Sequence, residues 1–187
     1  IIILFYQTPV YSKSTSFVNL KRKTISKYFS GIVAYQNEEN SKALDFFNSS
    51  KILTNDHGPY LKRYVHALIL ENKVAQAINI LKSNKEKENS NFFDANLLLI
   101  LDSLKKNQWD KAYAYTLKNN NFVVKDKLNE AILESLKQYI YVFKHKKILE
   151  NKKNLGKLST ITEAFQKCFL GDKNTDSYFS NLIHDPK

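Results

Sequence analysis

A polar turn that leads into an alanine recurs three times in this chain at a nearly constant interval. The turns lead into Ala43, Ala77 and Ala112, so the intervals are 34 and 35 residues. A period of this length is typical of a protein built from stacked copies of one supersecondary unit, because a single unit cannot bury its own apolar face. No other feature of the sequence constrains the fold as strongly.

The apolar residues around the first turn have the spacing of α-helices. Those that flank the turn lie three or four positions apart, as on one helix face: Tyr28, Phe29, Ile32 and Val33 before it, and Ala43, Leu44, Phe46 and Phe47 after it. With only four glycines and three prolines, the chain has too few turn-forming residues for many short strands. We therefore expect an all-α protein.

The repeated unit resembles the tetratricopeptide repeat (TPR). In that family the eighth position of a repeat is small and the twenty-fourth is aromatic; counted from Ala43 as the twentieth, these positions are Gly31 and Phe47. Apolar residues also surround Ala77 at the corresponding positions, and the unit around Ala112 follows the pattern less closely. The resemblance implies a right-handed α-α superhelix, a TPR-like solenoid of stacked antiparallel helix pairs. It also suggests the N-terminal part of a longer bacterial protein.

The helix breakers between units divide the chain. Residues 24–118 are expected to hold three TPR-like repeats, at about 24–57, 58–91 and 92–121, with Pro59 in the first turn of the second repeat. Residues 122–187 are expected to form divergent helical repeats, with a fourth helix pair and the truncated start of a fifth.

Three helices are predicted within this divergent region. Apolar periodicity predicts a long helix from Lys127 to about Leu149. Thr160 and Glu163 have the spacing of a capping box, which predicts a helix start there and a helix end at Gly171. A last helix is predicted to begin at Ser177–Ile183.

The N-terminal segment, residues 1–23, has two interpretations. Its apolar run, Ile1–Tyr6, is too short to span a bilayer, which needs roughly 20 residues. Val10 and Ser12 stand at minus three and minus one to a cut after Ser12, which is similar to the end of a secretory signal peptide and predicts an exported or periplasmic protein. Alternatively the segment is a lead-in that packs on the array of a cytoplasmic protein.

The net charge of +11 comes almost entirely from lysine, since the chain has only two arginines, Arg22 and Arg63. Lysine lacks the planar fork that suits phosphate and base recognition, so we do not expect nucleic acid as the partner. One basic cluster follows aromatic residues: Lys144, Lys146, Lys147, Lys152, Lys153 and Lys157. It is either a patch for an acidic partner or anionic surface, or a solvated helix end.

No pattern for catalysis or cofactor binding is present. The sequence has no glycine-rich phosphate loop, no His-Glu-x-x-His and no nucleophile elbow. Its four histidines are too scattered to share a helical face, and its single cysteine, Cys168, is expected to be a small buried hydrophobe. We therefore expect no enzyme activity, no cofactor and no metal site.

The family resemblance implies a concave surface lined by the first helix of each pair. Carrying the groove-facing positions onto this chain gives six candidates for a partner-binding groove: Tyr28, Ile32, Tyr35, Lys62, His66 and Ile69. Leu97 and Leu101 continue this groove or are buried. The competing interpretation is that the isoleucines belong to the core and the tyrosines fill space between helices.

The first functional hypothesis is a scaffold that binds a peptide or protein partner on this concave face without catalysis. The second is a structural or assembly domain at the N-terminus of a larger exported protein. The third is a lysine-rich binder of nucleic acid or another anionic surface. The sequence predicts no oligomeric state and no partner identity.

Overall fold

The computed structural model describes residues 22–55, 57–84, 88–117 and 126–184, and every regular element in these ranges is a helix. The α-helices in chain order are α1 (Arg22–Gln36), α2 (Asn40–Asn48), α3 (Gly58–Leu70), α4 (Val74–Ser83), α5 (Phe93–Lys105), α6 (Trp109–Leu117), α7 (Lys127–His145), α8 (Lys157–Phe169) and α9 (Thr175–His184). Two short 3₁₀ helices, η1 (Lys51–Asn55) and η2 (Glu88–Ser90), precede α3 and α5. The prediction of an all-α protein is confirmed.

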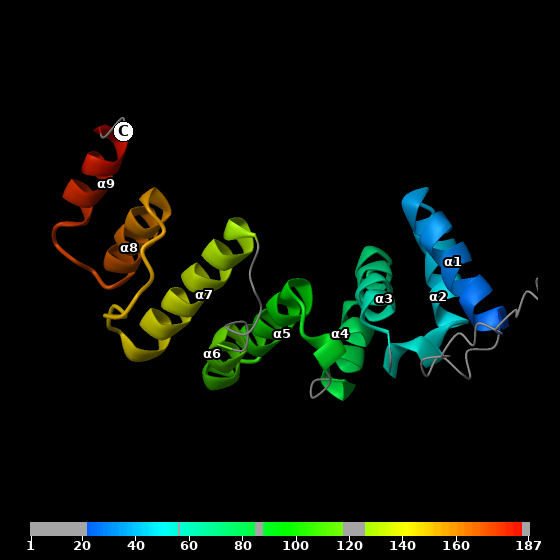
Figure 1. Ribbon diagram of the computed structural model, residues 1–187. Helices are drawn as coiled ribbons and strands as arrows, with labels where there is room; N and C mark the ends of the chain where they lie inside the picture. Colours follow the sequence, from blue (N-terminus) through cyan, green and yellow to red (C-terminus); the bar gives the residue numbers. More distant parts are fainter. Residues whose placement is uncertain (1–21, 56, 85–87, 118–125, 185–187) are drawn as a thin grey trace, which may run out of the picture.

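Each α-helix packs against the next one along the chain, from α1 to α9. The result is an elongated array with α1 and α9 at opposite ends (Figure 1). Contacts between neighbours in sequence dominate such an array, so each helix needs apolar residues for both the preceding and the following helix.

The same backbone turn closes α1, α3 and α5. Glu38, Asn72 and Asn107 take the left-handed conformation, with φ of 61°, 57° and 56°. After α1, the Glu39 N–H donates to the Ala34 carbonyl at 2.9 Å and the Glu38 N–H to the Tyr35 carbonyl, which is the Schellman motif. Equivalent bonds follow α3 and α5. The interval of 34 and 35 residues seen in the sequence is therefore also present in the backbone geometry.

The three alanines of the repeated turn are fully buried, because the paired helices cross closely there. Gly31 permits the closest approach. A Cβ added at Gly31 would lie 2.6 Å from Cε1 of Phe47, which is itself fully buried. Glycine at 31 and the aromatic ring at 47 thus fit together, and the sequence pattern that paired them describes a real contact.

The long helix α7 is shorter than predicted. It ends at His145 rather than near Leu149, because Lys146 takes the left-handed conformation (φ 54°) and its N–H donates to the Val142 carbonyl at 2.9 Å. At its start, the Asp126 side chain caps the helix by accepting from the Leu128 N–H at 2.9 Å.

The capping box predicted at Thr160 and Glu163 is wrong. Helix α8 begins at Lys157 after Gly156, whose combination of φ 64° and ψ −138° only glycine adopts without strain. Glu163 lies inside the helix and forms ion pairs with Lys152 and Lys167 instead of a cap. The predicted end at Gly171 is confirmed, since Gly171 has φ 71° and α8 ends at Phe169.

A Schellman turn at Gly171 joins α8 to α9, with the Asp172 N–H donating to the Lys167 carbonyl at 3.0 Å. The short turn makes α8 and α9 a pair, whereas residues 146–156 separate α7 from α8. This pairing differs from the predicted one, in which α7 and α8 formed the fourth pair and α9 began a fifth. Helix α9 also starts at Thr175, two residues before the predicted start.

The predicted N-terminal features at residues 1–12, including the cut after Ser12, lie outside the described residues. Across the part of the chain that is described, no helix combines the length and apolar character needed to cross a bilayer.

Candidate functional site

Two adjoining cavities lie over α1, α3 and α5, the first helices of the three repeated units. The apolar cavity has a volume of about 350 Å³ and is lined by Tyr35, His66, Ile69, Leu70, Asp94, Leu97, Leu98 and Leu101. The basic cavity has a volume of about 470 Å³ and is lined by Tyr35, Gly58, Pro59, Lys62, Arg63, His66, Asn89 and Phe92. Tyr35 and His66 line both cavities, so the two cavities adjoin, and we refer to them together as the groove.

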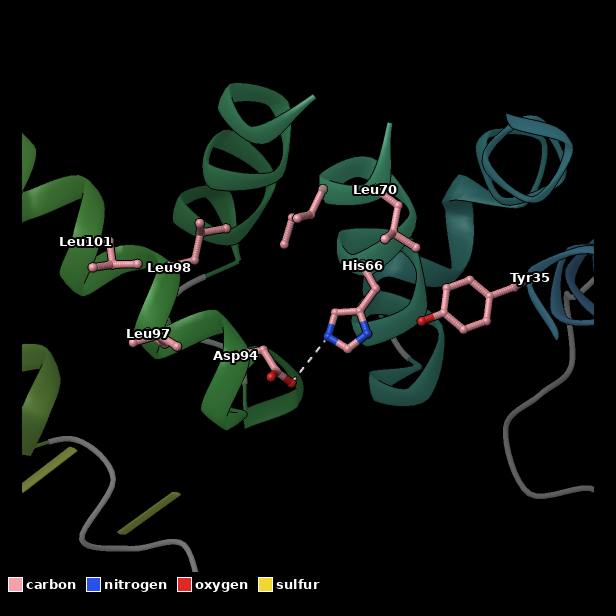
Figure 2. A pocket seen from close by; sticks show the side chains of 8 residues that line it. Tyr35, His66, Leu70, Asp94, Leu97, Leu98 and Leu101 are labelled. Atoms are coloured by element: carbon pink, nitrogen blue, oxygen red, sulfur yellow. Dashed lines mark ion pairs between the residues drawn. The ribbon is translucent and has the colours of Figure 1, made fainter. Parts of the chain in front are cut away.

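Helical spacing explains why these side chains gather. On α3, Lys62, His66 and Ile69 recur at intervals of four and three, so they share one face. The same spacing on α5 aligns Asp94 with its leucines. Figure 2 shows the leucines following one another along α5, while Tyr35 reaches toward His66 from α1.

Asp94 is the polar centre of the groove. Its Oδ2 atom lies 3.3 Å from Lys62 Nζ and 3.3 Å from His66 Nε2. All three side chains keep access to solvent, with 35% of Asp94, 51% of Lys62 and 29% of His66 exposed. Figure 2 shows the imidazole and the carboxylate directed at one another between α3 and α5. A single carboxylate oxygen therefore faces two nitrogen donors in an open site.

The structure brings four of the six predicted groove residues together: Tyr35, Lys62, His66 and Ile69 line the two cavities. Leu97 and Leu101 continue the groove, and Leu101 is 49% exposed. Sequence reasoning missed Asp94. The signal that could have found it is its place as the acidic residue in the first turn of α5, one repeat beyond the α3 residues it contacts.

Tyr28 and Ile32 line neither cavity. Tyr28 is only 7% exposed, and its ring packs against Phe47 and Tyr60. Its hydroxyl accepts a hydrogen bond from Arg63 at 3.0 Å. Ile32 is half-buried against the same core. For these two residues the structure agrees with the competing interpretation, in which they fill the space between helices.

Three lysines of the basic cluster near the end of α7 form ion pairs with acidic side chains of α6, α7 and α8. Lys144 pairs with Asp110 of α6, Lys152 with Glu163 of α8, and Lys153 with Glu130 of α7. Lys146 lies over the Phe169 ring at 4.3 Å, and Lys147 and Lys157 are exposed. The cluster therefore joins α6, α7 and α8 through ion pairs, and its lysines do not present one uninterrupted cationic face.

Asp102 of α5 is a buried carboxylate outside the groove. It accepts from Lys82 Nζ of α4 at 2.6 Å and pairs with Lys106 Nζ at 2.7 Å, with only 8% of its side chain exposed. Hydrogen bonds from Lys106 and Lys82 hold its pKa below the ordinary value. We assign it a structural role, since it ties α4 to α5.

Within the described ranges, no three histidine, cysteine, aspartate or glutamate side chains gather as a metal site would require. Cys168, expected to be buried, is an exposed free thiol.

No family model matches the chain, and neither the curated proteins nor the solved structures yield a match. The resemblance to the tetratricopeptide repeat therefore rests on the residues of the repeated turn and on the geometry around them.

Proposed function

We propose that α1–α6 form three TPR-like repeats of a right-handed superhelix, and that the groove over α1, α3 and α5 binds a peptide segment of a partner protein without catalysis. The observation that supports this proposal is the composition of the groove. The groove is lined by residues of three successive units and combines exposed leucines with an aromatic hydroxyl, two cations and a carboxylate. Apolar anchors beside a few polar groups are what peptide recognition requires.

The exposure of large side chains that line the apolar cavity supports the same function. Leu70 and Leu101 are 50% and 49% exposed although they line a cavity. Large apolar side chains that gather in a hollow mark sites at which a partner excludes water. The scaffold beneath them is rigid, because Leu61, Tyr64 and Leu68 on the opposite face of α3 are fully buried.

The test uses the complete chain and a phage library of random dodecapeptides, selected for binding in parallel on three proteins. The groove variant carries Leu70→Asn and Leu101→Asn. The control variant carries Ile52→Asn and Leu128→Asn, which are 65% and 64% exposed and lie outside both cavities. Circular dichroism and thermal melting establish that all three proteins fold.

We expect peptides to be enriched on the wild type and the control variant, with affinity for the groove variant lower by about tenfold, since two apolar anchors are lost. Equal enrichment on the wild type and the groove variant would show that the groove is not the binding surface.

The assembly hypothesis also has an observation in its favour. Ile25, Phe29 and Val33 recur every four residues on α1, and they are 37%, 58% and 56% exposed. A helix of another polypeptide would cover such a stripe in an assembly. A photo-crosslinking amino acid at Phe29 tests this role in the native host: an adduct with another polypeptide supports it, and the absence of any adduct argues against it.

A further inference from the structure

The groove is asymmetric along its length. Lys62 and Arg63 lie at its basic end, close to the start of α3, where the helix dipole adds further positive potential. His66 follows Lys62 by about one turn of α3, and Leu70 follows it by about two turns. Leu70 lines the apolar cavity, which forms the other end of the groove. A ligand that spans the groove therefore meets cations first and apolar side chains second.

A carboxylate already occupies the junction between the two ends. Asp94 Oδ2 lies 3.3 Å from both Lys62 Nζ and His66 Nε2. This distance is longer than that of a strong charge-assisted hydrogen bond, which is about 2.7–2.9 Å. Arg63 donates to neutral oxygens, the Tyr28 hydroxyl at 3.0 Å and the Pro59 carbonyl at 3.4 Å. The basic end of the groove thus attracts carboxylates, and it holds the Asp94 carboxylate only loosely.

We infer that the groove selects acidic peptides, and that a ligand carboxylate displaces Asp94 from Lys62 and His66 while an apolar side chain of the same ligand enters the leucine-lined cavity. This inference rests on the proposed function. Asp94 acts as an internal competitor: it occupies the two nitrogens while the groove is empty and opposes the ligand carboxylate when it arrives.

The spacing of the two ends sets the spacing in the ligand. Lys62 and Leu70 are eight positions apart on α3, which corresponds to about 12 Å at a rise of about 1.5 Å per residue. An extended peptide advances about 3.3 Å per residue, so its acidic and apolar residues would lie about four positions apart.

Asp94→Asn and Lys62→Gln change the same contact in opposite directions, which makes them a matched pair. Asparagine keeps the shape of Asp94 and removes the competing charge, so affinity for an acidic peptide rises. Glutamine at 62 removes the cation, so affinity falls. Misfolding could imitate the second effect but not the first. Lys111→Gln, an exposed lysine on α6 outside both cavities, is the control for net charge.

The experiment takes the peptides enriched by the wild type from the library of random dodecapeptides and measures the Kd of labelled copies by fluorescence anisotropy. We expect the enriched sequences to share an Asp or Glu about four positions from Leu, Ile or Phe. Changing that acid to its amide, or Lys62 to Gln, weakens binding about two- to fivefold, and Asp94→Asn strengthens it by a similar factor. Lys111→Gln leaves the Kd unchanged.

The outcomes separate the two proposals. Enriched peptides without a shared acidic residue, or an affinity that Asp94→Asn leaves unchanged or lowers, would overturn the inference while peptide binding stands. Enrichment no greater on the wild type than on the groove variant with Leu70→Asn and Leu101→Asn would overturn the proposed function, and the inference with it.

Discussion

The array has two regions that are stabilised by different kinds of contact. Between α1 and α4 the core consists of fully buried apolar and aromatic side chains, with Phe47, Tyr60 and Tyr64 among the largest. Between α7 and α8 the buried contact includes two amides: Gln166 Nε2 donates to Gln138 Oε1 at 3.3 Å, and the two residues are 1% and 2% exposed. The same helical array is thus held by ring packing at one end and by polar pairing at the other.

The difference shows why the repeat pattern fades along the chain. In the first region, glycine or alanine at each close crossing lets large rings interlock, and this needs particular residues at particular positions. In the second region, the phenylalanine rings of α8 contribute little to the core: Phe165 and Phe169 are 53% and 45% exposed. Polar and surface contacts accept many residue types, so no strict pattern is required there.

The largest expected effect separates the two regions directly. Phe47→Ala removes a fully buried ring that packs edge-on against Tyr60, and it should lower the free energy of unfolding by about 3–5 kcal/mol. Phe165→Ala, on α8, loses a half-exposed ring beside Phe179 and should cost about 1 kcal/mol at most. Urea denaturation followed by circular dichroism measures both. Equal losses would show that the two regions do not differ in packing.

A smaller change tests the close crossing of α1 and α2. Gly31→Ala places a methyl group 2.6 Å from the Phe47 ring, so the ring or a helix must shift, and we expect a loss of about 1–3 kcal/mol in the same measurement. Helix propensity alone predicts the opposite sign, because alanine favours a helix over glycine by about 1 kcal/mol. Stabilisation by Gly31→Ala would therefore disprove a tight contact at this position.

The sequence was sufficient to predict the features that depend on local pattern. The helices, the repeated turn and the small residues at 31, 43, 77 and 112 all follow from periodicity, since each is a requirement of close packing between sequence neighbours. The residues that line the groove could be predicted in part, because the repeat fixes which positions of each unit face it. Tyr35 and His66 are such positions.

Other features depend on contacts that no local pattern records. Tyr28 and Lys62 occupy the same place in successive repeats, 34 residues apart, but only Tyr28 has aromatic rings and a guanidinium around it. Tyr28 is therefore buried, whereas Lys62 is exposed. Asp94 joins Lys62 and His66 from another helix, and its role appears only when α3 and α5 are adjacent. The end of α7 was missed because lysine rarely takes the left-handed conformation found at Lys146.

The amide pair offers a sharper test of the second region. Gln138→Met leaves the buried Gln166 amide without its partner and should cost about 1–3 kcal/mol. Adding Gln166→Met removes the unpaired amide together with Gln166 Oε1, a buried atom with no hydrogen-bond partner, so the double variant should recover most of this loss. The hydrogen bond from Gln138 Nε2 to Glu134 Oε1 at 3.0 Å is absent from both variants, so the recovery should be incomplete. A double-mutant cycle in urea measures the coupling. Additive losses would mean that the amides contribute independently.

The smallest effect concerns Asp102, the buried carboxylate that ties α4 to α5. Because Lys106 and Lys82 lower its pKa in the folded state, the folded protein binds a proton there less readily than the unfolded chain does. The stabilisation is therefore complete above the ordinary value of 3.8 and is lost as the pH falls toward the lowered pKa.

Asp102→Asn should accordingly cost about 1 kcal/mol at neutral pH, since two charge-assisted contacts, each to a half-exposed lysine, are weakened. The gap between wild type and variant should narrow as the pH is lowered below the ordinary pKa of the carboxyl group, because protonation removes the same charge from the wild type. Thermal melting at a series of acidic pH values checks this. A gap that stays constant through that range would show that the fit of the side chain between α4 and α5, and not its charge, joins these two helices.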